Sequence, residues 1–534
     1  MGWYRKNFSV LLDLAGNNTK TAASIASGAI RVILTFDGVY MDSTMWVNEI
    51  PLGNHPYGYT TFSYELPTSA LSLEGENILA VKVDNRGSNS RWYSGSGIYR
   101  HVRLMLLNAT VAIAREGVVV TTPSVSIADD ARLAAEQSGV PAVTATSATI
   151  AVTLTLEATP SAPVATVTVT LASATTPKTV IATQSIQVQQ LHKERRVVTL
   201  TFKQSDVDLW SPISPNLYIA TATVAGQDAV KVTFGVRDFS FDVNKGFVIN
   251  AASMKLKGGC VHHDNGALGS AAIDAADRRR VKVLKDNGYN AIRTSHNPVS
   301  PAFLDACDEL GVIVMDEAFD CWFDGKNSAD YHVYFLDWWQ RDVASMVKRD
   351  INHASVLMWS IGNEIPGRDS PEGYAYAQNI SDYIRKLDKG GKRAVTSAYP
   401  GVNNKADPYF AALDVAGYNY GNSLYKSDHD RVPTRIMVGT ESFPAATATV
   451  WSDVEADPWV IGDFIWTAID YIGESSIGAN GHNAGGSSED FDACGGYCTQ
   501  VSERDRERQR VSARRIVIPP ATECAILLPC SPGN

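Results

Sequence analysis

Two glutamates of this chain each follow a short apolar run that is typical of a buried strand. Glu364 directly follows the run 355–363, and Glu441 directly follows the run 436–440. Runs of this length and composition predict strands, and a charge just past a buried strand suits the mouth of a parallel barrel. Two carboxylates facing each other across such a mouth can cleave a glycosidic bond. Either glutamate alone would also fit an exposed loop, so the hypothesis depends on the pair.

Glycosidic cleavage divides the work between the two groups. One carboxylic acid protonates the leaving oxygen, and the other carboxylate attacks the anomeric carbon or activates water there. Asn363 directly precedes Glu364, so its amide could hold a sugar hydroxyl beside the reacting carbon. Tyr418 and Tyr420 lie at the end of the apolar run before that of Glu441. If the two strands pair, a tyrosine phenol could orient Glu441.

Polar side chains also end two earlier apolar runs. The first run ends in His262, His263 and Asp264, and the second in Arg293, His296 and Asn297. Because strand ends of a barrel converge on one mouth, we expect these side chains within reach of one ligand. A metal site is the alternative. His262 and His263 are adjacent rather than four residues apart, so sugar binding is favoured.

Two further residues are ambiguous. Trp466 could stack on the apolar C–H face of a sugar or could equally be a core residue. We interpret Glu317 mainly as a structural carboxylate that holds the guanidinium of Arg293.

The elements that must position these groups alternate between strand and helix from about residue 237. The expected strands are Met254–Val261, Ala291–Thr294, Val312–Asp316, Val356–Gly362, Ala394–Ser397, Val415–Tyr418, Ile436–Thr440 and Gly462–Trp466. The expected helices include Ala271–Asp286, Pro301–Leu310, Phe335–Arg349 and Tyr374–Lys386. Eight such units predict a (β/α)8 TIM barrel in which Glu364 ends the fourth strand and Glu441 the seventh.

The rest of the chain predicts two β modules and a tail. Residues 1–108 alternate apolar and polar positions, as an antiparallel sheet domain does, with a loop over Gly16–Gly28. Residues 109–236 are rich in Thr, Val and Ala with period two, which favours an immunoglobulin-like β-sandwich. The barrel domain spans 237–480, and 481–534 is an irregular tail.

Composition narrows the function classes. A net charge of −10 argues against a nucleic-acid partner, and no run reaches the roughly 20 apolar residues of a membrane span. The N-terminus lacks the order of a signal peptide. We leave the compartment and the oligomeric state open, and a homo-oligomer is compatible with the sequence. Four of the seven cysteines, Cys494, Cys498, Cys524 and Cys530, crowd the tail. They could form a disulfide or zinc cluster, but no His has ligand spacing, so we expect no metal and no cofactor.

Several motifs in order resemble glycoside hydrolase family 2, specifically its β-galactosidase branch, from about residue 3 to about 478. They are Asn89–Arg100, which is similar to the end of the family's sugar-binding domain, Leu209–Pro212 with Pro215–Tyr218, Lys257–Gly266, Ile292–Pro298, and both glutamate segments. The resemblance implies a jelly-roll sugar-binding domain, an immunoglobulin-like sandwich and a barrel acting on carbohydrate by retaining double displacement. It makes Glu364 the acid/base and Glu441 the nucleophile, with carboxyl groups about 5 to 5.5 Å apart. It makes His262, His296 and Asn363 sugar-contacting residues, together with Tyr420 and Trp466.

The chain also departs from the family pattern. Some members hold magnesium with a Glu and a His after the third strand, where this chain has Asp320-Cys321-Trp322-Phe323, so the metal is not carried over. The first domain opens late in the jelly roll, the last barrel helix is unrecognisable from about Gly481, and the tail from Ser487 resembles nothing in the family. These ends are those expected of a truncated sequence.

Three functions remain open at this point. The first is a β-galactosidase acting on terminal β-linked galactose. The second is a β-glucuronidase, which needs a cationic clamp for the sugar carboxylate, and for which only Arg368 follows the fourth strand. β-Mannosidase fits the segment around Glu364 less well. The third is a sugar-binding pseudoenzyme, because a barrel without its last helix would leave apolar faces uncovered and the mouth loose.

Overall fold

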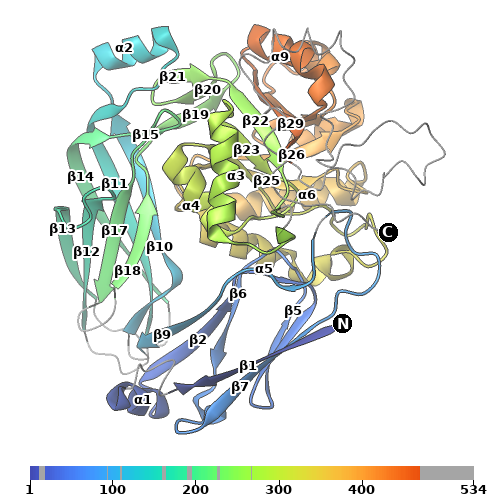
Figure 1. Cartoon of the computed structure of the whole chain (residues 1–534). Helices are drawn as coiled ribbons and strands as arrows, with labels where there is room; N and C mark the ends of the chain where they lie inside the picture. The colour runs from blue at the N-terminus through green and yellow to red at the C-terminus, as the bar shows by residue number, and fades with distance from the viewer. Residues whose placement is uncertain are drawn as a thin grey trace, which may run out of the picture.

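The computed structural model describes residues 1–10, 18–92, 94–108, 111–158, 164–188, 195–224, 229–265 and 268–469. Within them the chain forms two β sandwiches followed by a parallel barrel (Figure 1). The predictions for the tail, including its four cysteines, and for the last barrel helix lie outside the described residues. No helix of the described residues is long and apolar enough to cross a membrane.

The N-terminal sandwich, blue in Figure 1, has two main sheets. One has the order β1 (Gly2–Ser9), β7 (Glu76–Val83), β4 (Ser43–Val47), β5 (Ile50–His55), and the other β6 (Phe62–Leu66), β2 (Ile30–Phe36), β9 (Val102–Asn108). The short strands β3 (Val39–Tyr40) and β8 (Gly97–Ile98) pair beside them. Apolar side chains of both sheets form one buried cluster, including Leu34, Phe36, Met45 and Val81.

The prediction of a loop over Gly16–Gly28 is wrong for residues 19–26. Residues Thr19–Ala26 form the helix α1. The side chain of Asn18 accepts the N–H groups of Lys20 and Thr21, and Ile25 is fully buried. Capping and one buried apolar contact therefore offset the weak helix propensity of this Thr- and Ser-containing segment.

The second sandwich packs a three-stranded sheet on a four-stranded one. The first has the order β10 (Val111–Ser126), β11 (Thr144–Ala158), β14 (Arg196–Asp208), and the second β13 (Val180–Val188), β12 (Ala165–Ser173), β17 (Tyr218–Val224), β18 (Ala229–Phe234). Short elements accompany them: α2 (Asp129–Ser138), β15 (Trp210–Ser211) and β16 (Ser214–Pro215). In β12 and β17 buried residues alternate with half-buried ones, as the period-two composition predicts.

A small sheet of β19 (Phe239–Asp242), β20 (Gly246–Ile249) and β21 (Ala252–Met254) leads into the barrel. The barrel strands are β22 (Leu256–Val261), β23 (Ala291–Thr294), β24 (Ile313–Glu317), β25 (Val356–Asn363), β26 (Ala394–Pro400), β27 (Ala416–Asn419), β28 (Met437–Ser442) and β29 (Val460–Ile469). They pair in parallel in chain order, and β29 closes on β22. All eight predicted strands are confirmed within a few residues, and with them the TIM barrel.

The helices of the barrel lie around these strands (Figure 1). They are α3 (Asp274–Asp286), α4 (Pro301–Leu310), α5 (His332–Asp350), α6 (Pro371–Leu387), α7 (Asp407–Phe410), α8 (Tyr425–Arg431) and α9 (Thr447–Ala456). The bounds of α4 follow from local sequence. The Ser300 side chain accepts the N–H of Phe303, Pro301 opens the first turn, and Gly311 ends the helix at φ 70°. These are the preferred residues at a helix start and end.

The N-terminal sandwich contacts the barrel directly. The phenol of Tyr57 donates to the Ala318 carbonyl at 2.5 Å, and the Thr60 hydroxyl donates to Asp342 of α5 at 2.6 Å. Arg100, which follows β8, donates to the carbonyl of Pro298 at 2.7 Å. These contacts bring residues 85–92 of this sandwich to the carboxyl ends of the barrel strands, where Arg91 binds Asp320.

Candidate active site

Both glutamates lie at the carboxyl ends of their strands. Glu364 directly follows β25, and Glu441 is the fifth residue of β28. Two consecutive residues at the end of β27 bind them: the Asn419 amide donates to Glu364 Oε1 at 3.0 Å, and the Tyr420 hydroxyl donates to Glu441 Oε2 at 2.8 Å. The two carboxylates therefore share one rim of the barrel.

The backbone at this rim is unusual at two of these positions. Glu364 has φ 44° and Tyr420 has φ 54°, both in the left-handed region that non-glycine residues seldom adopt. Such conformations cost of order 1–3 kcal/mol each and persist where the surroundings fix them, often at functional sites. Each of these two residues directly follows a barrel strand, β25 or β27.

Arg293 is the centre of the charged network. It is fully buried on β23, and a guanidinium has five N–H donors. Its Nε and Nη2 donate to the two oxygens of Glu317 at 3.0 and 2.7 Å. Its Nη1 donates to Glu441 Oε1 at 2.9 Å and to the Thr440 carbonyl at 3.0 Å, and Nη2 also donates to Asn363 Oδ1 at 2.9 Å. Each of the five donors has an acceptor.

The expected pairing of Glu317 with Arg293 is thus present. Burial would raise the pKa of Glu317, but the Arg293 charge and the hydrogen bond from His296 hold that pKa below its usual value. His296 Nδ1 lies 2.9 Å from Glu317 Oε1, and the Ser360 hydroxyl donates to Oε2 at 2.7 Å. Glu317 is fully buried at this position, so it fixes Arg293 from below the mouth.

Aromatic rings form one wall of the site. The His296 ring stacks on Trp466 with 4.9 Å between centroids and 9° between planes. His262 meets Trp466 edge-on at 5.2 Å. Trp92, from the N-terminal sandwich, lies 4.5 Å from the His262 ring and 5.2 Å from that of Trp466. Burial, with His296 and His263 nearby, lowers the pKa of His262 well below its usual value, so its imidazole is neutral.

A second charged cluster lies beside Asn363. Asp320, in the loop after β24, accepts from the Asn363 amide at 2.9 Å, from Lys326 at 2.6 Å and from Arg91 at 3.1 Å. Burial would raise the pKa of Asp320, but Lys326, His296 and Arg91 together hold it well below its usual value. Burial would likewise lower the pKa of Arg91, and the charges of Asp320 and both rim glutamates raise it above its usual value.

This cluster occupies the stretch where the family resemblance raised the question of magnesium. The Asp320 carboxylate is already paired with an ammonium and a guanidinium, both of which would repel a divalent cation. Nowhere in the residues that the structure describes do three or more His, Cys, Asp or Glu side chains form a group suited to a metal ion. The residues here do not fit that metal, and no step below is routed through one.

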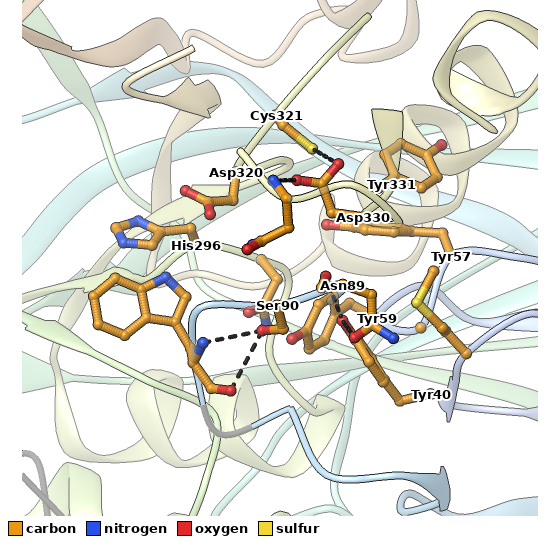
Figure 2. A pocket seen from close by; sticks show the side chains of 15 residues that line it. Tyr40, Tyr57, Tyr59, Asn89, Ser90, His296, Asp320, Cys321, Asp330 and Tyr331 are labelled. Carbon is orange, nitrogen blue, oxygen red and sulfur yellow. Dashed lines mark hydrogen bonds between the residues drawn. The ribbon is translucent and has the colours of Figure 1, made fainter. Parts of the chain in front are cut away.

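A small cavity of about 50 Å³, room for a few water molecules, adjoins the site. Figure 2 shows Tyr40, Tyr59, Asn89 and Ser90 of the N-terminal sandwich on one side of it, with Asp320 and His296 of the barrel opposite. Neither rim glutamate lines this cavity. The cavity therefore borders the site at Trp92, His296 and Asp320, between the sandwich and the barrel.

The structure brings together most of the predicted site residues. Arg293 contacts Glu441 and Asn363, and Tyr420 also contacts Glu441, whereas Glu364 is held by Asn419. Ring contacts join His296 to His262 and Trp466. His263 lies elsewhere. Its ring faces Tyr59 and Tyr99 at the sandwich interface at 5.1 and 5.6 Å, and burial lowers its pKa to about 3.

Two other residues that the sequence singled out have structural contacts. Asn297 donates to the adjacent Pro298 carbonyl. Arg368, considered for a sugar carboxylate, lies over the Tyr399 ring and donates to the carbonyls of Ile365 and Pro400.

Sequence reasoning did not propose five residues of the site: Arg91, Trp92, Asp320, Lys326 and Asn419. A signal existed for Asn419, because it ends a strand between two tyrosines already considered for the nucleophile. Arg91 lies in the motif Asn89–Arg100, but nothing local in the sequence pairs it with Asp320, 229 residues away. The predicted separation of the carboxyl groups stays a prediction.

Comparison with known proteins points to one family. Residues 242–429 match the family profile described as glycosyl hydrolases family 2, TIM barrel domain, and residues 132–237 match that of glycosyl hydrolases family 2. A Bacteroides ovatus protein named beta-galactosidase BoGH2A is 33% identical, over 89% of this chain and 61% of its own length. A putative beta-glucuronidase of Formosa agariphila is 32% identical, over 89% of this chain and 47% of its own.

A solved structure is similar throughout the described fold. It is a glycosyl hydrolase family 2 member from Bacteroides cellulosilyticus, with a TM-score of 0.78, 37% identity, and coverage of 90% of this chain and 60% of that one. The chain spans about half to three fifths of the length of the curated relatives it matches. The profiles cover more than half of its residues and agree with the sandwich-then-barrel order. The chain belongs to glycosyl hydrolase family 2.

Proposed function

We propose that this protein is a retaining glycoside hydrolase that removes terminal β-D-galactosyl residues through a covalent glycosyl-enzyme. The observation that carries the proposal is the pair of contacts from Asn419 and Tyr420, which hold Glu364 and Glu441 at one rim. Asn419 and Tyr420 are consecutive, and the left-handed backbone at Tyr420 departs from the extended conformation in which neighbouring side chains point to opposite sides. The two carboxylates that they bind therefore lie near each other. Two neighbouring carboxyl groups are what a double displacement needs.

In the first step a Glu441 oxygen bonds to the anomeric carbon while the bond to the leaving oxygen breaks. Glu364 gives its proton to that oxygen. In the second step water attacks the same carbon, Glu364 takes the water proton, and the bond to Glu441 breaks, which restores both groups.

The neighbours of Glu441 suit the role of nucleophile. Arg293 and Tyr420 each donate to one of its oxygens, which fixes the carboxylate plane. Burial, and then the Glu441 charge, raise the pKa of Tyr420 far above its usual value, so its phenol remains a hydrogen-bond donor. A fixed, oriented carboxylate loses less entropy on attack than a free one.

The cluster around Asp320 favours a neutral sugar. A glucuronide carries a carboxylate at C6 and needs an unpaired cation for it. The two cations beside Asn363, Arg91 and Lys326, both bind Asp320, and the ionised Asp320 would repel a second carboxylate. β-Glucuronidase is the second candidate because the same two cations would suit a uronate if Asp320 moved away.

The test is turnover of p-nitrophenyl β-D-galactoside and β-D-glucuronide. We expect cleavage of the galactoside with the β-anomer released first, read by proton NMR. Faster cleavage of the glucuronide would make the second candidate correct. If neither is cleaved while the folded protein still binds galactose, it is a sugar-binding pseudoenzyme. The segment of the last barrel helix, whose expected absence motivated this alternative, lies outside the described residues.

Two substitutions test the roles of the glutamates. Glu441→Gln should abolish turnover of every substrate, and near-wild-type activity would refute the nucleophile assignment. Glu364→Ala should slow substrates with poor leaving groups most, because an activated aryl glycoside needs little help from a general acid. Equal loss for all leaving groups would give Glu364 another role.

A further inference from the structure

One oxygen of Asp320 accepts three hydrogen bonds at the barrel mouth. Its Oδ1 accepts from Lys326 Nζ at 2.6 Å, from Asn363 Nδ2 at 2.9 Å and from Arg91 Nη2 at 3.1 Å. The side chains of Arg91 and Asp320 remain 35% and 25% exposed. The cluster is thus open to a ligand in the mouth and is not sealed in the core.

The cluster is joined to the candidate catalytic groups on two sides. Asn363 links it to Arg293 through its other amide atom, at 2.9 Å, and directly precedes Glu364. Lys326 also donates to the backbone carbonyl of Asn363 at 2.9 Å.

The second link comes from the N-terminal sandwich. Arg91 precedes Trp92, and its guanidinium lies over the Trp92 ring, 5.0 Å from the centroid. That ring contacts His262, His296 and Trp466. A sugar held against this aromatic wall would therefore lie within the field of Arg91 and Asp320.

The charges of the cluster do not cancel. Arg91 and Lys326 are both paired with the single carboxylate of Asp320. Without that carboxylate, both cations would face the mouth unpaired. An ionised Asp320 makes the mouth suitable for hydroxyl groups, which can donate to a carboxylate. Without the negative charge of Asp320, Arg91 and Lys326 could together bind an anionic group of a ligand.

We propose that Asp320 is a specificity-determining residue that selects neutral sugars against uronic acids by occupying Arg91 and Lys326. This inference rests on the proposed function. It states that the site distinguishes sugars by the charge of the substituent at C6. Loss of the negative charge of Asp320 should shift the substrate preference toward an anionic sugar.

The decisive measurement compares two substrates that differ only at C6, p-nitrophenyl β-D-galactoside and p-nitrophenyl β-D-galacturonide. Wild-type protein should have the higher kcat/KM for the galactoside. Asp320→Asn should shift the kcat/KM ratio toward the galacturonide by roughly 30-fold, the factor expected for one unit charge at about 8 Å near a protein surface. The shift should shrink at high salt, because exposed charges are screened.

Control variants separate charge from damage to the loop. Asp324→Asn removes an exposed carboxylate of the same loop and should leave the ratio unchanged. Arg91→Gln keeps Asp320 and removes a cation, so the ratio should move the opposite way, further toward the galactoside. If Asp320→Asn does not fold, as judged by circular dichroism, the sign of the Arg91→Gln shift decides the question.

Binding provides a readout that does not need turnover. Titration with galactose and with galacturonate, followed by tryptophan fluorescence, should show the same change of preference in Asp320→Asn. An unchanged preference in an active, folded Asp320→Asn would overturn this inference and leave the proposed function intact. Absent turnover with the predicted shift in binding would overturn the proposed function alone. Wild-type preference for the galacturonide would overturn the inference directly.

Discussion

Replacing Glu317 with Gln tests whether the buried ion pair with Arg293 supports both the fold and Glu441, the proposed nucleophile. Glu317 accepts two hydrogen bonds from Arg293, at 3.0 and 2.7 Å, and both side chains are fully buried. A Gln at this position keeps one acceptor oxygen but places an NH2 group against a guanidinium N–H. One charge-assisted bond becomes a contact between two donors.

The size of the effect follows from these contacts. A hydrogen bond to a charged group contributes about 1.5–3 kcal/mol, and removing one partner of a buried pair costs about 3–5 kcal/mol. The Arg293 charge would then be balanced mainly by Glu441, at 2.9 Å. Because a carboxylate held more tightly by a cation is a weaker nucleophile, we expect Glu317→Gln to lose both stability and kcat.

Urea denaturation at pH 7 measures the stability, and kcat on the aryl galactoside measures the chemistry. The pKa of Glu317 is lowered in the folded state, so its stabilising contribution is present above the unfolded carboxyl pKa of about 4.3 and is lost as pH falls through the folded value. The gap between wild type and variant should therefore narrow in acid. Glu372→Gln, exposed on α6, is the matched control. A Glu317→Gln variant within 1 kcal/mol of wild type at pH 7 would refute the reasoning.

Two further predictions concern Tyr420 and Asp342. Tyr420→Phe removes the 2.8 Å hydrogen bond to Glu441 and keeps the ring stacked on Phe443. We expect kcat to fall about 10–100-fold while the melting temperature stays unchanged. A loss of kcat below 3-fold would contradict the role given to the phenol. Burial raises the pKa of Asp342, at the sandwich interface, to about 7. Because the folded state holds this proton more tightly than the unfolded one, wild-type stability should decrease as pH rises from about 4 to 7, by up to about 4 kcal/mol. Asp342→Asn should lack this decrease in urea melts, exposed Asp337→Asn should retain it, and a variant as pH-sensitive as wild type would exclude Asp342 as its source.

The strands of the barrel could be predicted from local sequence because a buried strand consists of consecutive apolar residues. Every residue of β25 is buried, so this strand reads as one continuous apolar run. A polar residue at the end of such a run stands out, which is why Glu364, Glu441, Arg293 and His296 could be proposed as one group. The closed parallel order then places those ends on one face without further information.

Local pattern failed where a contact decides the structure. The segment around α1 looks like a loop, and the Asn18 cap together with burial of Ile25 makes it a helix. His263 looks like a partner of His262, yet adjacent residues at the end of a strand point to opposite sides. Its ring faces the tyrosines of the sandwich interface instead.

The sequence by itself determined the barrel and the position of its two rim carboxylates, because both depend on periodicity within a few residues. Only the tertiary structure decided what surrounds them. The contact between Arg91 and Asp320 spans 229 residues and depends on how the N-terminal sandwich docks against the barrel. The sequence around either side chain does not reveal the other, so only the docking of the sandwich shows that Arg91 joins Asp320 and Lys326 at the barrel mouth.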